Sequence, residues 1–345
     1  MKSKYIISIL IAALLVGCSS GSSDTDDTPT TGTTDSDTIT DDSTDSVDYS
    51  LTGGDITDVI LVNTSANCEE YVNSYYSSVT DVQEDVFFTG TLDIEILDGK
   101  CNFTSNSIPN HDFDGTGNFA TKTAEVALNY SMTTSPEVAD EVTALSLGTN
   151  AVMLNGVKLD ILADGCYGVG DGKIGCSDIS APFRYDPMSP LVHFGTDSHN
   201  AHTQPTGQYH YHGDPIALYT NDESDYIESP VIGFAQDGFP IYGMYYKDDN
   251  DVIQKTTSSY ELKTGARETS DGVNPPDENE DGIYDDYDGQ FRDDYEYVEG
   301  SGVLDECNGM TRSDGTYGYY VTDSYPWVIG CYKGTPDNSF SNGRP

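Results

Sequence analysis

Cationic side chains are scarce in this sequence. Its 345 residues include 15 Lys and Arg against 59 Asp and Glu, which gives a formal net charge of -44 at pH 7. None of the cationic residues falls between Lys4 and Lys100. This composition excludes nucleic acid as a partner, because the chain has little with which to neutralise phosphates. We expect the acidity to maintain solubility in a salty medium or to attract divalent cations outside the cell.

Long hydrophobic runs are also absent, apart from one at the amino terminus. There Lys2 and Lys4 precede an apolar run that ends at Cys18. The run is too short for a stable membrane span and is typical of a secretory signal. The letters LVGC that end at Cys18 resemble the bacterial lipobox, which implies cleavage after residue 17 and lipidation of Cys18. Ser19 follows directly, as in lipoproteins sent to the outer membrane.

We therefore expect a signal peptide at 1–17 and an envelope lipoprotein that contacts the membrane only through the lipid on Cys18. An ordinary signal peptide with a chance cysteine is the alternative. Residues 18–50 consist mainly of Ser, Thr, Asp and Gly, which bury too little apolar surface to offset the entropy of ordering the chain. This segment is predicted to be a disordered acidic tether. Residues 51–345 are long enough for one large domain or two small ones, and we expect one.

Closely spaced cysteine pairs of the zinc-finger type do not occur, which argues against a thiolate zinc site. With Cys18 lipidated, six of the seven cysteines remain, an even number that indicates disulfides in an exported protein. Sequence alone does not choose among the possible pairings. Proximity in the chain favours three bonds: Cys68 with Cys101, Cys166 with Cys176, and Cys307 with Cys331.

Helical periodicity is weak throughout the predicted domain. Only residues 68–78 and 135–147 have a helical pattern, and there is neither a fixed-period repeat nor an alternation of strands with helices. Short β-prone runs separated by Gly, Pro, Asn and Asp account for most of the rest. We expect a mainly β, irregular, disulfide-stapled domain, sandwich-like or built from several sheets, with strands at 86–97, 123–132, 151–161, 209–212, 231–234, 241–246 and 317–321.

Histidine, in contrast, is concentrated in one stretch, since five of the six fall between residues 193 and 212. Residues 209–212 alternate Tyr and His. On an extended strand His210 and His212 share one face and the two tyrosines share the other, so that both imidazoles can bind one ion. His202 lies just before the intervening turn and can return to the same face. Cross-strand packing with satisfied hydrogen bonds is the alternative.

Several separated motifs carry a family resemblance. They are SNSIPNH at 105–111, LNGVKLD at 154–160, GQYHYHGDP at 207–215, SPVIGFAQDGFPIYG at 229–243, LDECNG at 304–309 and YPWVIGCYKG at 325–334. In this order they resemble the YHYH domain family of bacterial envelope and secreted proteins, over residues 105–334. The resemblance implies a fold unit and a set of candidate residues, without an established reaction.

The resemblance selects side chains that can act as metal ligands or as acid–base groups. The matching segments contain His111, His202, His210, His212, Asp237, Asp305 and Glu306. His193 and His199 lie between the motifs and are weaker candidates. One position departs from the family pattern: Gly318 stands where members often carry the histidine of a second Tyr and His strand. If that histidine is an essential ligand elsewhere, this protein would bind its ion more weakly or differently.

We expect His202, His210 and His212 to hold zinc or copper, since imidazole with carboxylate suits zinc and imidazole alone suits copper equally well. No methionine adjoins the histidines, which argues against a thioether copper(I) site. Asp305 and Glu306 are expected to orient the imidazoles by hydrogen bonding.

Asp237 and His111 are the candidates for a general base. Asp237 is followed by Gly238 and, after Phe239, by Pro240, which is a turn signature. An aspartate that stabilises its own turn by accepting backbone N–H groups is therefore the alternative for Asp237.

A different pattern occurs at 277–288, which reads DENEDGIYDDYD. Its oxygen-bearing side chains are spaced around a glycine turn, at Asp277, Asn279, Asp281, Asp285 and Asp288. Such a string can wrap calcium, which takes roughly six to eight oxygens. It resembles the calcium loops of thrombospondin type 3 repeats and departs from an EF-hand. We expect an inserted, calcium-binding surface loop at 271–290. A solvated acidic loop is the alternative, and 164–178 is a weaker second candidate.

Three functions are compatible with these features. The first is an envelope-anchored metal-binding protein, in which the histidines fill the coordination sphere of zinc or copper. The second is a zinc-dependent extracellular hydrolase, in which an open coordination position holds a water whose pKa the ion lowers to about 7. The third is an adhesion module with loops stiffened by calcium. The sequence does not choose between the first two, because an open coordination position is a matter of geometry.

Overall fold

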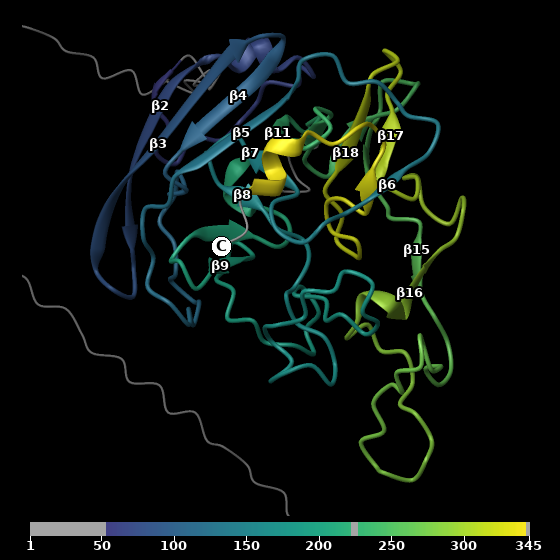
Figure 1. The fold of residues 1–345 in the computed structure, drawn as a ribbon. Coiled ribbons are helices and arrows are strands. Elements are labelled where there is room, and N and C mark those ends of the chain that lie inside the picture. Colours follow the sequence, from purple (N-terminus) through teal and green to yellow (C-terminus); the bar gives the residue numbers. More distant parts are fainter. Residues whose placement is uncertain (1–52, 222–226, 343–345) are drawn as a thin grey trace, which may run out of the picture. The chain divides into compact units, whose positions relative to one another are not determined.

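The computed structural model describes residues 53–221 and 227–342 of this chain (Figure 1). The chain divides into two units, Met1–Ser46 and Val47–Pro345, and the described residues all belong to the second. The predicted signal peptide at 1–17 and the tether at 18–50, with the lipidation site Cys18, lie outside the described residues. In the part that is described, no helix is long and apolar enough to cross a membrane.

One sheet has five strands in sequence order, and all neighbours are antiparallel except the first pair. Its strands are β1 (Gly54–Asp55), β2 (Asn73–Asp81), β3 (Val86–Leu97), β4 (Lys100–Ser105) and β5 (Leu128–Thr133). Along β2 and β4 every second residue is buried. This period of two is expected for a sheet with one face against a core and one face in water.

A second, mixed sheet has eight strands in the order β17-β18-β12-β11-β7-β8-β10-β9. In chain order these are β7 (Ala151–Met153), β8 (Lys158–Leu159), β9 (Ala201–Thr203), β10 (Tyr209–Tyr211), β11 (Val231–Ala235), β12 (Pro240–Tyr242), β17 (Gly309–Thr311) and β18 (Tyr317–Tyr320). The six strands from β18 to β10 are buried at every residue, so both faces of the sheet are covered.

The two sheets share a core. Phe234 of β11 meets the rings of Tyr71 and of Phe103 on β4, at centroid distances of 5.7 and 6.2 Å. Small antiparallel pairs complete the fold: β13 (Tyr245–Lys247) with β14 (Ile253–Lys255), β15 (Tyr260–Leu262) with β16 (Tyr295–Tyr297), and β6 (Thr143–Ala144) with β19 (Cys331–Tyr332). The described residues also form four 3₁₀ turns, η1 (Cys68–Tyr71), η2 (Ile216–Leu218), η3 (Arg292–Asp294) and η4 (Asn338–Asn342).

The prediction of a mainly β domain with several sheets is confirmed. The helical prediction for 68–78 is wrong, because only Cys68–Tyr71 forms a short 3₁₀ turn and Asn73–Asp81 is a strand. Alternate burial of Tyr75, Ser77 and Val79 is consistent with a strand, since a helix would place Ser77 on the side opposite to Tyr75 and Val79. Residues 135–147 are irregular apart from β6, so the second helical prediction is also wrong.

All three disulfides form as proximity suggested, Cys68–Cys101, Cys166–Cys176 and Cys307–Cys331. The acidic stretch lies between two paired strands, since β15 and β16 are antiparallel neighbours and residues 263–294, which include η3, connect them. Figure 1 shows this connection as a yellow-green loop that extends away from β15 and β16.

Candidate metal centre

The histidines are positioned by a tight hairpin. Strands β9 and β10 pair antiparallel with His202 opposite His210, and His212 follows the end of β10. The turn between the strands begins at Gln204, whose carbonyl accepts the Gly207 N–H at 2.8 Å. Gly207 has φ +85°, and an added Cβ would approach the Lys122 carbonyl at 2.8 Å, so glycine is required here.

The turn sequence QPTG suits this geometry, since Pro at the second and Gly at the fourth position favour a type I turn. The tight turn brings His202 back beside His210, as the sequence predicted.

The three imidazoles converge through their Nε2 atoms. His212 Nε2 lies 3.0 Å from His210 Nε2 and 3.0 Å from His202 Nε2. Among the described residues this triad is the only group of three or more His, Cys, Asp or Glu whose ligand atoms all lie within 4.8 Å of one another. Nitrogens bound to tetrahedral zinc at ~2.0–2.1 Å are separated by roughly 3.3 Å, which is close to the spacing observed.

The hydrogen bonds around the triad leave lone pairs of Nε2 atoms facing one another at its centre. His202 Nδ1 lies 2.5 Å from the Phe194 carbonyl, and His210 Nδ1 lies 3.2 Å from the Gln208 carbonyl. A carbonyl only accepts, so both Nδ1 atoms carry the proton and each neutral ring keeps a lone pair on Nε2. His212 can donate at most one Nε2 proton, so at least one of its two contacts opposes two lone pairs. A cation between the three nitrogens would remove this repulsion.

Burial keeps these rings neutral. It lowers the pKa of His202, and it places the pKa values of His210 and His212 well below the usual histidine value. The neighbouring imidazoles lower the pKa of His210 and His212 further, and so does the charge of Lys158. Neutral imidazole is the form that binds a metal, so protons compete weakly for this site.

Three polar residues that sequence reasoning missed share the face of the triad. Lys158 of β8 pairs in register with His210, which pairs with His202, so the three side chains form a row across neighbouring strands. Asp160 accepts hydrogen bonds from Lys158 Nζ at 3.2 Å and from Gln204 Nε2 at 3.1 Å. The alternation of Lys158 and Asp160 in LNGVKLD indicates that the two side chains share one face of a strand. It does not indicate that this strand pairs with β10.

A cavity of about 880 Å³ adjoins this face. The triad, Lys158, Asp160 and Gln204 contribute to its lining, and loops of the irregular connections form the rest. A metal held by the three imidazoles would therefore have access to a space large enough for a small molecule.

His111 lies with the tyrosines of β10, on the face opposite to the triad. Its Nε2 contacts the Tyr211 hydroxyl at 2.7 Å, its Nδ1 contacts the Asp112 carbonyl at 2.8 Å, and its ring lies 4.0 Å from that of His199. Burial, helped by His199, lowers the pKa of His111 to about 3. His111 does not line the triad's cavity. The structure therefore does not bring this predicted base together with the predicted ligands.

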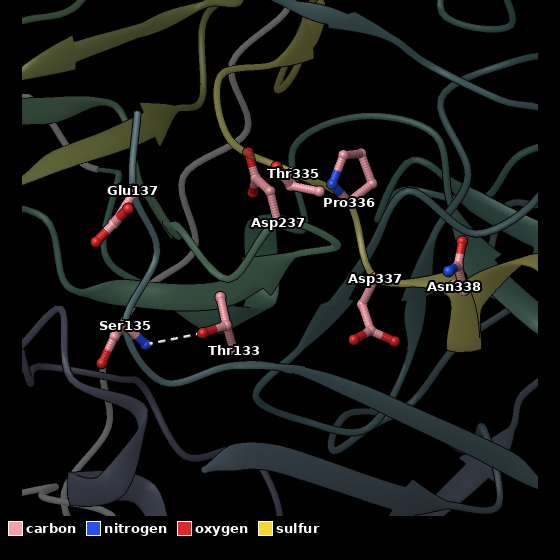
Figure 2. A pocket seen from close by; sticks show the side chains of 8 residues that line it. All are labelled: Thr133, Ser135, Glu137, Asp237, Thr335, Pro336, Asp337 and Asn338. Atoms are coloured by element: carbon pink, nitrogen blue, oxygen red, sulfur yellow. Dashed lines mark hydrogen bonds between the residues drawn. The ribbon is translucent and has the colours of Figure 1, made fainter. Parts of the chain in front are cut away.

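Asp237 stabilises the turn that follows β11. Its carboxylate accepts the N–H groups of Phe239 at 3.3 Å and Gly334 at 2.9 Å and the Tyr319 hydroxyl at 2.5 Å. Burial raises its pKa, while these hydrogen bonds oppose the shift. Figure 2 shows Asp237 at a separate cavity of about 360 Å³, whose lining contains none of the three histidines. This placement fits the alternative of a turn-stabilising aspartate.

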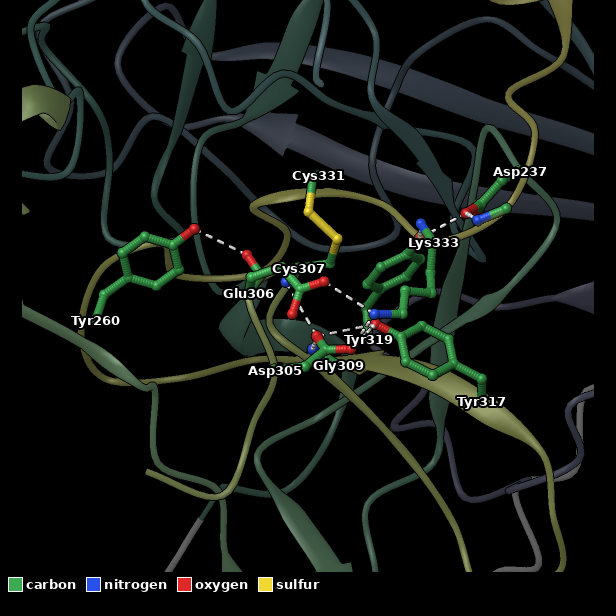
Figure 3. The surroundings of a disulfide bond; sticks show 11 residues. Asp237, Tyr260, Asp305, Glu306, Cys307, Gly309, Tyr317, Tyr319, Cys331 and Lys333 are labelled. Carbon is green, nitrogen blue, oxygen red and sulfur yellow. Dashed lines mark hydrogen bonds and ion pairs between the residues drawn. A yellow bond between two sulfur atoms is a disulfide. The ribbon is translucent and has the colours of Figure 1, made fainter. Parts of the chain in front are cut away.

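Asp305 and Glu306 interact with a lysine instead of an imidazole (Figure 3). Lys333 Nζ lies 3.2 Å from Asp305 and 3.0 Å from Glu306, next to the Cys307–Cys331 disulfide. Asp305 also accepts the Tyr317 hydroxyl at 3.1 Å and the Cys307 N–H at 3.0 Å. The pair therefore organises a turn beside the disulfide and is not brought to the triad.

Gly318, the departure from the family pattern, lies on β18. Four strands separate β18 from β10 in the sheet, which at ~4.8 Å per strand places the two about 24 Å apart. An added Cβ at Gly318 would also approach the Tyr242 ring at 2.5 Å. A histidine at this position would be remote from the triad, so its absence takes no ligand from this site.

The acidic loop uses its carboxylates for local contacts. Asp277 accepts the N–H groups of Asp281 at 3.2 Å and Gly282 at 2.8 Å, and Asp281 accepts that of Ile283 at 2.9 Å. Asp285 accepts the Glu278 N–H at 3.3 Å. Asn279 is exposed. Asp288 pairs with the buried Arg267. The predicted calcium ligands are therefore present at the surface without converging on one point.

The weaker candidate at 164–178 forms a stapled turn, closed by Cys166–Cys176. Asp171 there accepts the Lys173 N–H at 3.0 Å.

Comparison with known proteins gives one match. A family model described as YHYH protein matches residues 129–334. Neither the curated proteins nor the solved structures contain a match to the chain. The matched range includes the histidine hairpin, Lys158 and Asp160, and the segment around Asp237. It begins after His111, which the resemblance read from the sequence had included.

Proposed function

This chain belongs to the YHYH protein family, and from that premise we propose that it binds one zinc or copper ion through His202, His210 and His212. The observation that carries the proposal is the pair of 3.0 Å contacts from His212 Nε2 to the other two Nε2 atoms, which the available protons cannot both satisfy. Three imidazoles are a common protein donor set for both ions.

The metal content of purified protein tests this proposal. We expect about one zinc or copper ion per chain in wild-type protein and almost none in a His210→Ala, His212→Ala double variant. A His193→Ala, His199→Ala variant is the matched control, because it removes two histidines from the same stretch without touching the triad. Wild-type protein without stoichiometric metal, or equal metal in the double variant, would refute the proposal.

A zinc-dependent hydrolase is the second candidate, and the cavity beside the triad favours it. Three protein ligands leave a fourth position for water, as in catalytic zinc sites. Asp160 and Asp164 are the carboxylates on the cavity wall, so a base would come from them rather than from Asp237 or His111. Hydrolysis of p-nitrophenyl acetate by zinc-loaded protein, lost in the His210→Ala, His212→Ala variant, would support this function. Its absence would leave metal binding alone.

Anchoring in the cell envelope rests on the lipobox resemblance at Cys18. We expect Cys18→Ser to move the protein from the membrane fraction to the soluble exported fraction. Membrane retention of that variant would contradict the assignment. The calcium loop and a role in adhesion are separate proposals, and neither is needed for the metal centre.

A further inference from the structure

The cavity beside the triad has a mixed lining. One wall is the polar face formed by Lys158, His210 and His202, and apolar side chains such as Phe119, Leu162 and Phe194 contribute to the rest. Its volume of about 880 Å³ lies in the range of sites that enclose a small organic ligand.

Lys158 is an unusual residue in this wall, because lysine side chains are seldom buried. Its side chain is 1% exposed, in a chain that has only 15 Lys and Arg against 59 Asp and Glu. Buried lysines are rare unless they are paired, and here Asp160 supplies the partner at 3.2 Å. The charge of Lys158 acts on each of the three imidazoles, as its neighbouring position in the sheet requires.

The three ligands themselves would bring no counter-charge to a divalent ion on the triad. The three imidazoles are neutral ligands, and the carboxylate of Asp160 is already engaged by Lys158 and Gln204. An uncompensated charge in a poorly solvated site is costly, whereas an anion that contacts both the ion and Lys158 would offset it. The open coordination position and the ammonium group thus favour the same kind of ligand.

Building on the proposed metal centre, we propose that the cavity binds a carboxylate ligand with an apolar body. Its carboxylate lies between the ion and Lys158, and its apolar part packs against Phe119, Leu162 and Phe194. The protein would then be a receptor or a processing enzyme for small organic acids, even though its surface is strongly acidic.

Cobalt-loaded protein and three probes test the ligand class. Phenylacetate carries both features, acetate lacks the apolar body, and phenylacetamide lacks the charge. We expect phenylacetate to change the visible Co²⁺ spectrum in a saturable way, acetate to bind about tenfold or more weakly, and phenylacetamide to leave the spectrum unchanged. This comparison needs no variant. Equal response to phenylacetate and phenylacetamide, or no response to phenylacetate, would overturn the inference.

A matched pair of variants tests the role of Lys158. Lys158→Met with Asp160→Asn removes both charges, so no unpaired charge remains buried. Lys173→Met is the control, because Lys173 also lines the cavity but is exposed. We expect phenylacetate affinity to fall at least tenfold in the double variant, with cobalt content retained, and to stay unchanged in the control. Unchanged affinity in the double variant would refute the inference.

Cobalt content separates the two proposals. Wild-type protein that takes up no cobalt would remove both the metal centre and the ligand site. Stoichiometric cobalt without a phenylacetate response would remove the ligand site alone.

Discussion

The histidine hairpin (201–212) and the acidic loop (277–288) both carry several metal-ligand side chains at short spacing, and they differ in what surrounds them. The hairpin histidines are buried or nearly so, and their Nε2 atoms face one point. The loop carboxylates are mostly exposed, and several bond nearby backbone N–H groups. Spacing in the sequence was informative for the hairpin because strand pairing fixes where the rings point. The loop is held by one isolated antiparallel bridge, between Ala266 and Asp286, and this bridge does not bring its carboxylates together.

The base of the acidic loop is nevertheless firmly held. Arg267, with a side chain 1% exposed, makes two bonds of 2.8 Å to the fully buried Asp294 and also pairs with Asp288. Its guanidinium lies 4.9 Å from the centre of the Phe291 ring. The base of the loop therefore has a protein cation bound to two carboxylates, whereas the hairpin has three imidazole nitrogens that face one another.

The largest expected effect comes from removing that protein cation. Arg267→Met leaves Asp294 buried and unpaired, and we expect the free energy of unfolding to fall by about 3–5 kcal/mol in urea titrations. Lys263→Met is the control, because Lys263 is half-buried and contacts the Asp293 carbonyl and the Tyr287 ring, so its removal takes no partner from a buried carboxylate. Calcium should not restore the loss. Restoration by calcium would mean that a bound ion can replace the arginine. The loop would then depend on a cation in the same way as the hairpin.

Acid should act first on the histidine region. The pKa of His111 is about 3 in the folded protein and about 6.5 in the unfolded chain. Below pH 6.5 the unfolded chain therefore binds a proton that the folded protein does not. The free energy of unfolding should fall progressively between pH 6.5 and 3, by on the order of 4 kcal/mol for this group.

Chelator-treated protein should be used, so that metal loss does not contribute to the pH dependence. His111→Gln should make the decline shallower, with the triad histidines, whose pKa values burial also lowers, causing part of what remains. His193→Gln, at an exposed position, should leave the decline unchanged. A decline of the same steepness in His111→Gln would show that other groups cause it.

Zinc should stabilise the protein by binding at the hairpin histidines and not at the acidic loop. At a free zinc concentration of about 100 times Kd we expect a gain of roughly 2.7 kcal/mol, visible as a rise in Tm. His202→Asn should abolish the gain, and Asp281→Ala should retain it. Loss of the zinc effect in Asp281→Ala would mean that the ion acts at the acidic loop.

Calcium should give the smallest effect, since the loop carboxylates do not converge and Asp288 is already paired. We expect a stabilisation under about 1 kcal/mol, or roughly 2 °C in Tm. Asp281→Ala should abolish it, and His202→Asn should not. No response to millimolar calcium would identify the segment as a solvated acidic loop.

The hairpin was predictable because its information is local. The alternation of Tyr and His, with Pro205 and Gly207 in the turn, determines which side chains share a face. Lys158 was not predictable as a neighbour of His210, because the parallel pairing of β8 with β10 joins residues far apart in the chain. Of the contacts between residues that are not neighbours in the chain, only the three disulfides were predicted, and they were inferred from the closeness of the paired cysteines in the sequence.

The helical prediction at 68–78 failed for a related reason. Glu69 and Glu70 suit a helix, but Tyr75, Ser77 and Val79 all face the core from the strand beside β3, and burial outweighed local propensity. Asp237 shows the opposite case, since its glycine and proline neighbours correctly indicated a turn.

The triad draws all its nitrogens from one short hairpin, and this has a consequence for assembly. An ion captured there would close only a small ring of chain, so it would restrict the unfolded polypeptide far less than a link between remote strands does. It could also bind before the eight-stranded sheet is complete. A metal bound there would then serve as an early nucleus, before the pairing of β10 with β8 brings Lys158 beside the histidines.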